Sequence, residues 1–127
     1  MLVDSSVWIA ASSPRKKECK QLKELLVNKG HQLCISQIIR LEVAQGARSK
    51  EQFNKLWNGF SSLVMLEVKE SHWQMVAFNF MKCRSKGISI STNDCLIATL
   101  AQQYHVPLWS LDKIFQKVQP ILGLELN

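Results

Sequence analysis

Short apolar runs that alternate with helical patterns constrain the fold of this chain most. Four runs have the length of a buried strand: "MLVD", "QLCIS", "LVMLEV" and "VPLWSLD". Stretches with helical spacing separate these runs. Strands that are almost entirely apolar are typical of the centre of a parallel sheet. The alternation therefore predicts an α/β protein with a short, mainly parallel central sheet and helices on its faces.

Helix start and stop signals divide the stretches between these runs. Ser36 is a candidate cap for one helix, and Ser91 or Thr92 for another, while Gly30 and Gly87 are candidate stops. We expect helices at about 5–11, 15–30, 37–46, 51–60, 70–87 and 91–105, a last turn near 113–118, and a final short strand in "ILGLELN". In the helix at 51–60, apolar residues recur at helical spacing and predict an amphipathic face: Phe53, Leu56, Trp57 and Phe60.

Size and composition indicate one globular domain spanning residues 1–127. Hydrophobic residues make up 46% and charged residues 20% of the chain, so disorder is not expected. No apolar run approaches the ~20 residues of a membrane span, and the N-terminus lacks a signal-peptide pattern, so we expect a cytoplasmic protein without membrane contact. The net charge of +6 favours anionic partners such as nucleic acid or an acidic protein, although a merely soluble surface is also consistent with it.

The four cysteines lie far apart and form no CxxC pair, and the three histidines do not complete a zinc motif. We therefore expect reduced thiols that are mostly buried.

Two of the only three aspartates stand where an apolar strand finishes, Asp4 after "MLV" and Asp112 after "LWSL". Ligands of parallel α/β folds bind beyond the carboxyl ends of the strands. If these two strands are neighbours, the two carboxylates lie side by side.

Two further acids lie on apolar helix faces. Asp94 shares a face with Ile97, although, taken alone, an acid in a first helical turn is better explained by the helix dipole. Glu42 follows Ile38 and Ile39 at helical spacing, which places a charge in the apolar sector of its helix. Such a charge is costly unless it is paired or bound to a cation.

Four converging carboxylates would repel one another unless one of them took up a proton or a cation neutralised them. Carboxylates without a nearby thiol or imidazole pair suit Mg²⁺ or Mn²⁺. Such an ion activates water and stabilises a leaving oxygen, so acids, metal and a basic surface together suggest phosphodiester hydrolysis.

Four segments in this order resemble the motifs of PIN-domain ribonucleases, and specifically of VapC-type toxins: "MLVDSSVWI", "ISQIIRLEVAQGAR", "NDCLIATLA" and "PLWSLDKIF". The resemblance covers essentially the whole chain. It implies a three-layer α/β/α fold and an Mg²⁺- or Mn²⁺-dependent RNA endonuclease, the toxin of a toxin–antitoxin pair.

By that match, Asp4, Glu42, Asp94 and Asp112 are the catalytic acids and hold one or two metal ions, while Ser6 and Ser110 support them. The fourth motif departs from the family pattern at Ile114, where a further acid is frequent. Asn93 could add a neutral ligand or a hydrogen bond, or simply belong to the helix start.

Partners follow from the same resemblance and from the surface. Basic residues near the acid motifs are candidates for holding the RNA backbone, although each is also explained as a solvated side chain: Arg40, Arg48, Lys82, Arg84 and Lys113. The aromatic residues exceed what a small core needs, which suggests a partner surface. The resemblance implies a homodimer and a cognate antitoxin that blocks the acid site.

Two other functions are weighed against ribonuclease activity. The chain could be a catalytically weak PIN-like scaffold that binds RNA or a protein without cleavage. Alternatively, Asp4 could be a phosphotransfer nucleophile. That pattern needs a second acid two residues after the nucleophile, and this chain has Ser6 there.

Overall fold

A four-stranded, all-parallel sheet with the strand order β3-β2-β1-β4 forms the centre of the computed structural model, which describes residues 1–127. The strands are β1 (Leu2–Val3), β2 (Cys34–Ser36), β3 (Val64–Leu66) and β4 (Leu108–Trp109). In the register, Leu2 pairs with both Cys34 and Leu108, and Val3 pairs with Trp109. The first and last strands are therefore neighbours, which is the condition for Asp4 and Asp112 to lie close together.

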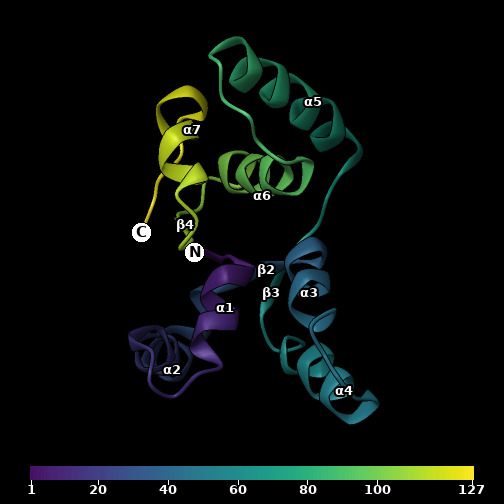
Figure 1. The fold of residues 1–127 in the computed structure, drawn as a ribbon, viewed down its shortest axis with the longest axis vertical. Helices are drawn as coiled ribbons and strands as arrows, with labels where there is room; N and C mark the ends of the chain where they lie inside the picture. Colours follow the sequence, from purple (N-terminus) through teal and green to yellow (C-terminus); the bar gives the residue numbers. More distant parts are fainter.

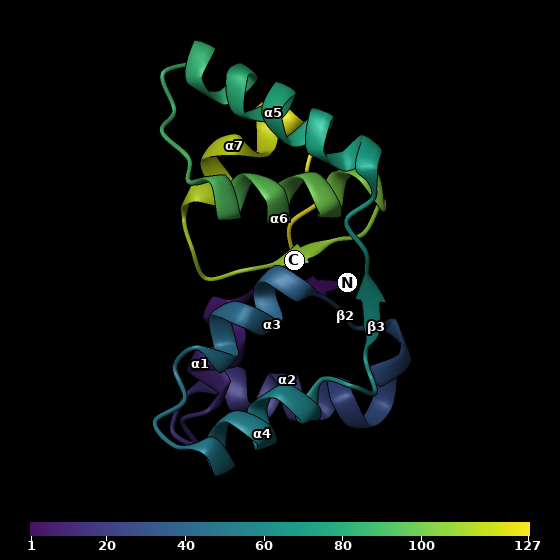
Figure 2. The same cartoon turned by 90° about the vertical axis from the view of Figure 1, so that its right-hand side faces the viewer.

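Helices cover both faces of this sheet and complete three α/β/α layers (Figures 1 and 2). Helices α5, α6 and α7 gather on one side, and α1, α2 and α4 on the other, with α3 close beside the strands. The helices are α1 (Ser5–Ala11), α2 (Lys17–Lys29), α3 (Gln37–Ala44), α4 (Lys50–Gly59), α5 (Glu70–Ser85), α6 (Thr92–Gln103) and α7 (Ile114–Leu122), with a 3-10 turn η1 (Gly30–Gln32) before β2. None of these helices is long and apolar enough to cross a membrane.

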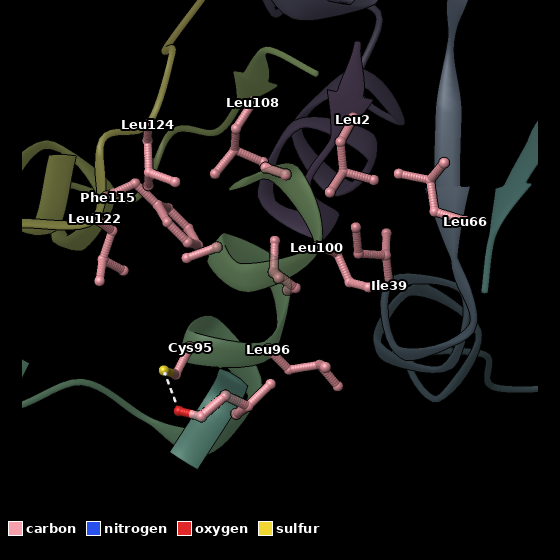
Figure 3. Packing of buried hydrophobic residues seen from close by; sticks show 14 of the residues in the cluster. Leu2, Ile39, Leu66, Cys95, Leu96, Leu100, Leu108, Phe115, Leu122 and Leu124 are labelled. Atoms are coloured by element: carbon pink, nitrogen blue, oxygen red, sulfur yellow. Dashed lines mark hydrogen bonds between the residues drawn. The ribbon is translucent and has the colours of Figure 1, made fainter. Parts of the chain in front are cut away.

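The alternation of side chains along β1 and β4 contributes to two cores. Leu2 and Leu108 face the larger cluster of 21 buried residues, which also contains Leu100 of α6 and Phe115 of α7 (Figure 3). The next residue along each strand points the other way, and Val3 and Trp109 join a cluster of five with residues of α1 and α2. Because both faces are buried, the strands must be apolar throughout, which is why the sequence shows runs and not alternation.

The C-terminal segment differs from the prediction. Helix α7 continues past the expected turn to Leu122, with Pro120 inside it, and Gly123 ends it in the left-handed region with φ 68°. Phe115, Val118 and Leu122 share one buried face of this helix, so packing extends it. The expected final strand is reduced to one parallel bridge, between Leu108 and Leu126.

Two apolar faces are less buried than their spacing predicts. Helix α4 contains no buried residue, and of its predicted face only Phe60, just after the helix, is buried. Trp73 of α5 lies three residues before the buried Val76, yet it is 52% exposed. The four cysteines are free and buried, as predicted.

Candidate active site

The pairing of β1 with β4 places the first and last motifs side by side. Val3 pairs with Trp109, and the backbone N–H of Asp4 donates to the Trp109 carbonyl at 2.9 Å. The chain leaves both strands at this level, so Asp4 and Ser110 become neighbours at the carboxyl ends of the sheet. Asp4 is the N-cap of α1 and only 4% exposed, which makes its carboxylate the buried floor of the site.

Two serine hydroxyls hold one oxygen of the Asp4 carboxylate. Ser6 Oγ donates to Asp4 Oδ2 at 2.6 Å, and Ser110 Oγ donates to the same oxygen at 2.7 Å. These hydroxyls in turn accept backbone N–H groups of the loop after β4, from Leu111 to Ser6 Oγ and from Asp112 to Ser110 Oγ, each at 3.0 Å. The network fixes the orientation of the carboxylate and leaves Asp4 Oδ1 with only a 3.5 Å contact to Ser5 Oγ.

Asp112 lies at the exposed edge of the same network. Its Oδ1 accepts the backbone N–H of Ile114 at 3.0 Å, at the start of α7. This contact satisfies a free donor of the first helical turn and holds the Asp112 side chain close to the loop.

Asp94 lies in the first turn of α6, where Ser91 is the N-cap and accepts the Asp94 N–H at 3.1 Å. Burial is the main cause that raises the pKa of the Asp94 carboxyl. The Ser91 hydrogen bond lowers this pKa, and the charges of Asp112 and then Asp4 raise it by smaller amounts. Three acids that are distant in the sequence therefore interact electrostatically at one place.

Glu42 of α3 reaches the same helix start through Asn93. Asn93 Nδ2 donates to Glu42 Oε1 at 3.3 Å, so a half-buried carboxylate has an uncharged partner one residue before Asp94. The sequence left the role of Asn93 open between a ligand, a hydrogen bond and a helix start. The structure gives it the hydrogen bond.

The predicted cap of α3 is only partly confirmed. Ser36 occupies the N-cap position, but its hydroxyl makes no capping hydrogen bond and is buried without a partner.

The five predicted RNA-contacting cations occupy different surroundings. Arg40 donates through Nε and Nη2 to the Trp57 carbonyl at 2.9 and 2.7 Å and lies over the Trp57 ring, so it joins α3 to α4. Lys82 and Arg84 lie in the last turn of α5, where they complement the helix dipole. Arg48 and Lys113 are exposed, and Lys113 directly follows Asp112.

The donor set at the carboxyl edge fits a hard divalent cation. Each of the four acids supplies oxygen ligands, and the like charges that raise the pKa of Asp94 are those a cation would neutralise. As the side chains stand, no group of three or more His, Cys, Asp or Glu side chains is close enough together to hold a metal ion.

The fold and the site together define a class of protein: an α/β/α protein with a parallel sheet and acidic residues beyond the carboxyl ends of its strands. The chain belongs to the PIN domain family, because the sequence model of that family matches residues 1–119. PIN domains are nucleases and generally use divalent metal ions. The predicted family and fold are both confirmed.

Solved structures with this fold include several toxin–antitoxin complexes. A chain of VapBC2 from Rickettsia felis, bound to a promoter DNA fragment, matches with a TM-score of 0.78 and 21% identity over 99% of this chain and 96% of that one. A chain of VapBC-1 from nontypeable Haemophilus influenzae matches with a TM-score of 0.76 and 21% identity, over 99% of this chain and 95% of that one. A chain of DNA-bound VapBC from Salmonella typhimurium matches with a TM-score of 0.76 and 18% identity, over 99% of this chain and 95% of that one. No curated protein sequence is similar enough to this chain to count as a match.

Proposed function

We propose that this chain is a metal-dependent RNA endonuclease and the toxin of a toxin–antitoxin pair. The observation that supports this proposal is that the fold brings the segments carrying the four motif acids to one edge of the sheet, although their side chains as they stand form no metal-holding group. Asp4 and Asp112 arrive through paired strands, Asp94 is close enough for both of them to raise the pKa of its carboxyl, and Glu42 is joined to the same helix start by Asn93.

In this proposal Asp4, Glu42, Asp94 and Asp112 hold one or two Mg²⁺ or Mn²⁺ ions. A bound ion would supply Lewis acidity toward a phosphate oxygen and lower the pKa of water. The chain itself contributes orientation. Ser6 and Ser110 hold Asp4 Oδ2 and leave Oδ1 with only a 3.5 Å contact to Ser5 Oγ. One of the four carboxylates would accept the proton of the attacking water.

The RNA backbone is held by positive charge around the acids. The net charge of +6 attracts phosphates at long range, and Lys113 and Arg48 are exposed and free to contact them.

The partners in this proposal are a cognate antitoxin and a second copy of the chain. The VapBC complexes among the structural neighbours support an antitoxin. An apolar groove of about 270 Å³ between α1, α2 and α4 offers such a partner a surface, with Trp8, Leu22 and Leu56 among its lining residues. Exposed apolar residues of α5 offer a second surface: Trp73, Phe78 and Met81.

The decisive experiment compares RNA cleavage by purified wild-type chain, Asp4→Ala and Asp94→Asn in Mn²⁺, with Glu51→Gln as a control on an exposed surface. We expect both site variants to lose cleavage by at least roughly 100-fold while they remain folded. Undiminished cutting by either site variant would contradict the assignment. Sequencing the 5′ ends of cut RNA from cells that express the chain then identifies the substrate.

The alternative function is a PIN-like scaffold that does not cleave RNA. A measurement of metal binding distinguishes this scaffold from a metal-dependent nuclease. An ion that binds only the native state raises the melting temperature. No shift at millimolar Mn²⁺, together with retained RNA binding, would favour the scaffold.

A further inference from the structure

A groove between α2 and the end of β4 adjoins the acid site. It has a volume of about 640 Å³, with Trp109 and Leu111 in its wall. Leu111 belongs to both places, since its backbone N–H donates to Ser6 Oγ in the network that holds Asp4. A single-stranded RNA bound at the acids therefore has direct access to this groove.

One carboxylate in this groove has no partner. Glu18, in the first turn of α2, is only 6% exposed and lines the groove, and no hydrogen bond or ion pair within the chain engages it. The only fully buried side-chain polar atoms without a partner are Ser36 Oγ and Asn79 Oδ1, so the Glu18 oxygens keep access to the groove. A carboxylate that is largely buried but keeps its oxygens open toward a groove can accept N–H donors from a ligand that binds there.

The neighbours of Glu18 indicate the chemistry of that ligand. Gln21 and Asn28 follow on the same face of α2 and offer amide donors and acceptors. A second carboxylate, Glu24, and two cations, Lys17 and Lys29, also line the groove. Hydrogen-bonding groups and cations along one groove suit a base with its phosphate. The volume is ample for one nucleotide, and single-stranded RNA is read by hydrogen bonds to splayed-out bases.

We propose that this groove is a nucleobase pocket, in which the Glu18 carboxylate accepts N–H donors from an unpaired base next to the cleaved phosphate. Guanine fits best, because its N1–H and N2–H form two parallel donors for one carboxylate. Uracil fits worst, because carbonyl oxygens flank its single N–H. This inference rests on the proposed ribonuclease function and adds a determinant of sequence preference.

The test uses the full chain and a library of short single-stranded RNAs randomised around one cleavage position. We expect the wild type to prefer guanine at one position, and Glu18→Gln to reduce the guanine-over-uracil ratio there by roughly 10-fold. Gln21→Ala, in the same groove, should also change that ratio, and it serves if Glu18→Gln fails to fold. The control is Glu51→Gln on α4, which should leave the ratio as it is.

The outcomes separate this inference from the ribonuclease proposal. Cleavage with the same base preference in the wild type and both groove variants would overturn the nucleobase pocket alone. If the wild type cuts no RNA, the proposed function fails. Fluorescence anisotropy with labelled hexanucleotides containing one guanine or one uracil then decides, and equal binding of the two by the wild type overturns the pocket. Loss of affinity for a protein partner in Glu18→Gln, with unchanged base preference, also overturns it and assigns the groove to that partner.

Discussion

Ser110 Oγ donates a hydrogen bond to Asp4 Oδ2 at 2.7 Å, although the two residues are 106 positions apart in the chain. Ser6 donates to the same oxygen and lies 3.2 Å from Ser110, so two hydroxyls serve one buried carboxylate. The arrangement ties the loop after β4 to the start of α1 and gives Asp4 one orientation.

Replacing Ser110 by Ala should therefore weaken both the fold and the site. A hydrogen bond to a charged group contributes about 1.5–3 kcal/mol, and loss of a residue that orients a ligand typically costs roughly 10–100-fold in metal affinity or activity. Urea unfolding and an Mn²⁺ titration measure the two effects. Ser61→Ala, which removes a hydroxyl bonded to a carbonyl far from the acids, is the matched control.

The double variant Ser6→Ala/Ser110→Ala adds a sharper test. Both hydroxyls share one acceptor and contact each other, so the two losses of unfolding free energy should not simply add. Additivity within about 0.3 kcal/mol would show that the hydroxyls act independently.

The charge on Asp94 should destabilise the metal-free protein at neutral pH. Its pKa is raised in the folded state, mainly by burial and then by Asp112 and Asp4, so the folded state binds more protons than the unfolded state between the two pKa values. Stability is thus lost as the pH rises from the ordinary aspartate range through the raised pKa. Asp94→Asn removes this loss, and its stability relative to the wild type should increase from pH 3 to pH 7.

Urea unfolding of both proteins across this pH range, in chelator, measures the difference. The wild type should recover the deficit when Mn²⁺ is added at pH 7, and Asp94→Asn should not. A difference between the two proteins that does not change with pH would contradict the raised pKa of Asp94.

The sequence predicts the fold and the acid positions well because both depend on local patterns. Each buried strand is an apolar run, and Asp4 and Asp112 immediately follow such runs, so the parallel sheet brings them together once β1 and β4 are paired. What the sequence could not predict depends on packing between distant elements. The extension of α7 through Pro120 and the exposure of Trp73 are set by which helix face meets the sheet.

Within the site, partners of side chains were likewise beyond sequence reasoning. Asn93 and Glu42 are 51 residues apart, and no spacing rule connects them. Glu18 lies in an ordinary-looking lysine-rich helix, and only its burial separates it from the solvent-exposed Glu24.

Asn93 should position Glu42 for metal binding. Its amide occupies Glu42 Oε1 without adding a fifth charge, so Asn93→Ala should weaken Mn²⁺ binding by roughly 10-fold, as expected for a residue that orients a ligand. Because Asn93 is exposed, the melting temperature without metal should change little. Thr92→Ala, in the same exposed turn, is the control, and equal Mn²⁺ affinities of the two variants would contradict the positioning role.

Arg40 should contribute mainly to stability, since its guanidinium is engaged within the chain. Two of its N–H groups reach the Trp57 carbonyl, and its planar group lies 4.0 Å from the centre of the Trp57 ring, which in turn stacks on Phe53. Arg40→Ala should lower the free energy of unfolding by about 1–3 kcal/mol, and Arg40→Lys should restore little, because lysine has neither the fork nor the flat face.

The salt dependence of RNA binding separates this structural role from a phosphate contact. A residue that neutralises one phosphate contributes about 0.7 to the slope of log affinity against log salt for a single strand. Arg40→Ala should leave that slope unchanged, whereas Lys113→Ala, an exposed cation beside Asp112, should reduce it. A reduced slope in Arg40→Ala, with normal stability, would instead place its guanidinium on the RNA backbone.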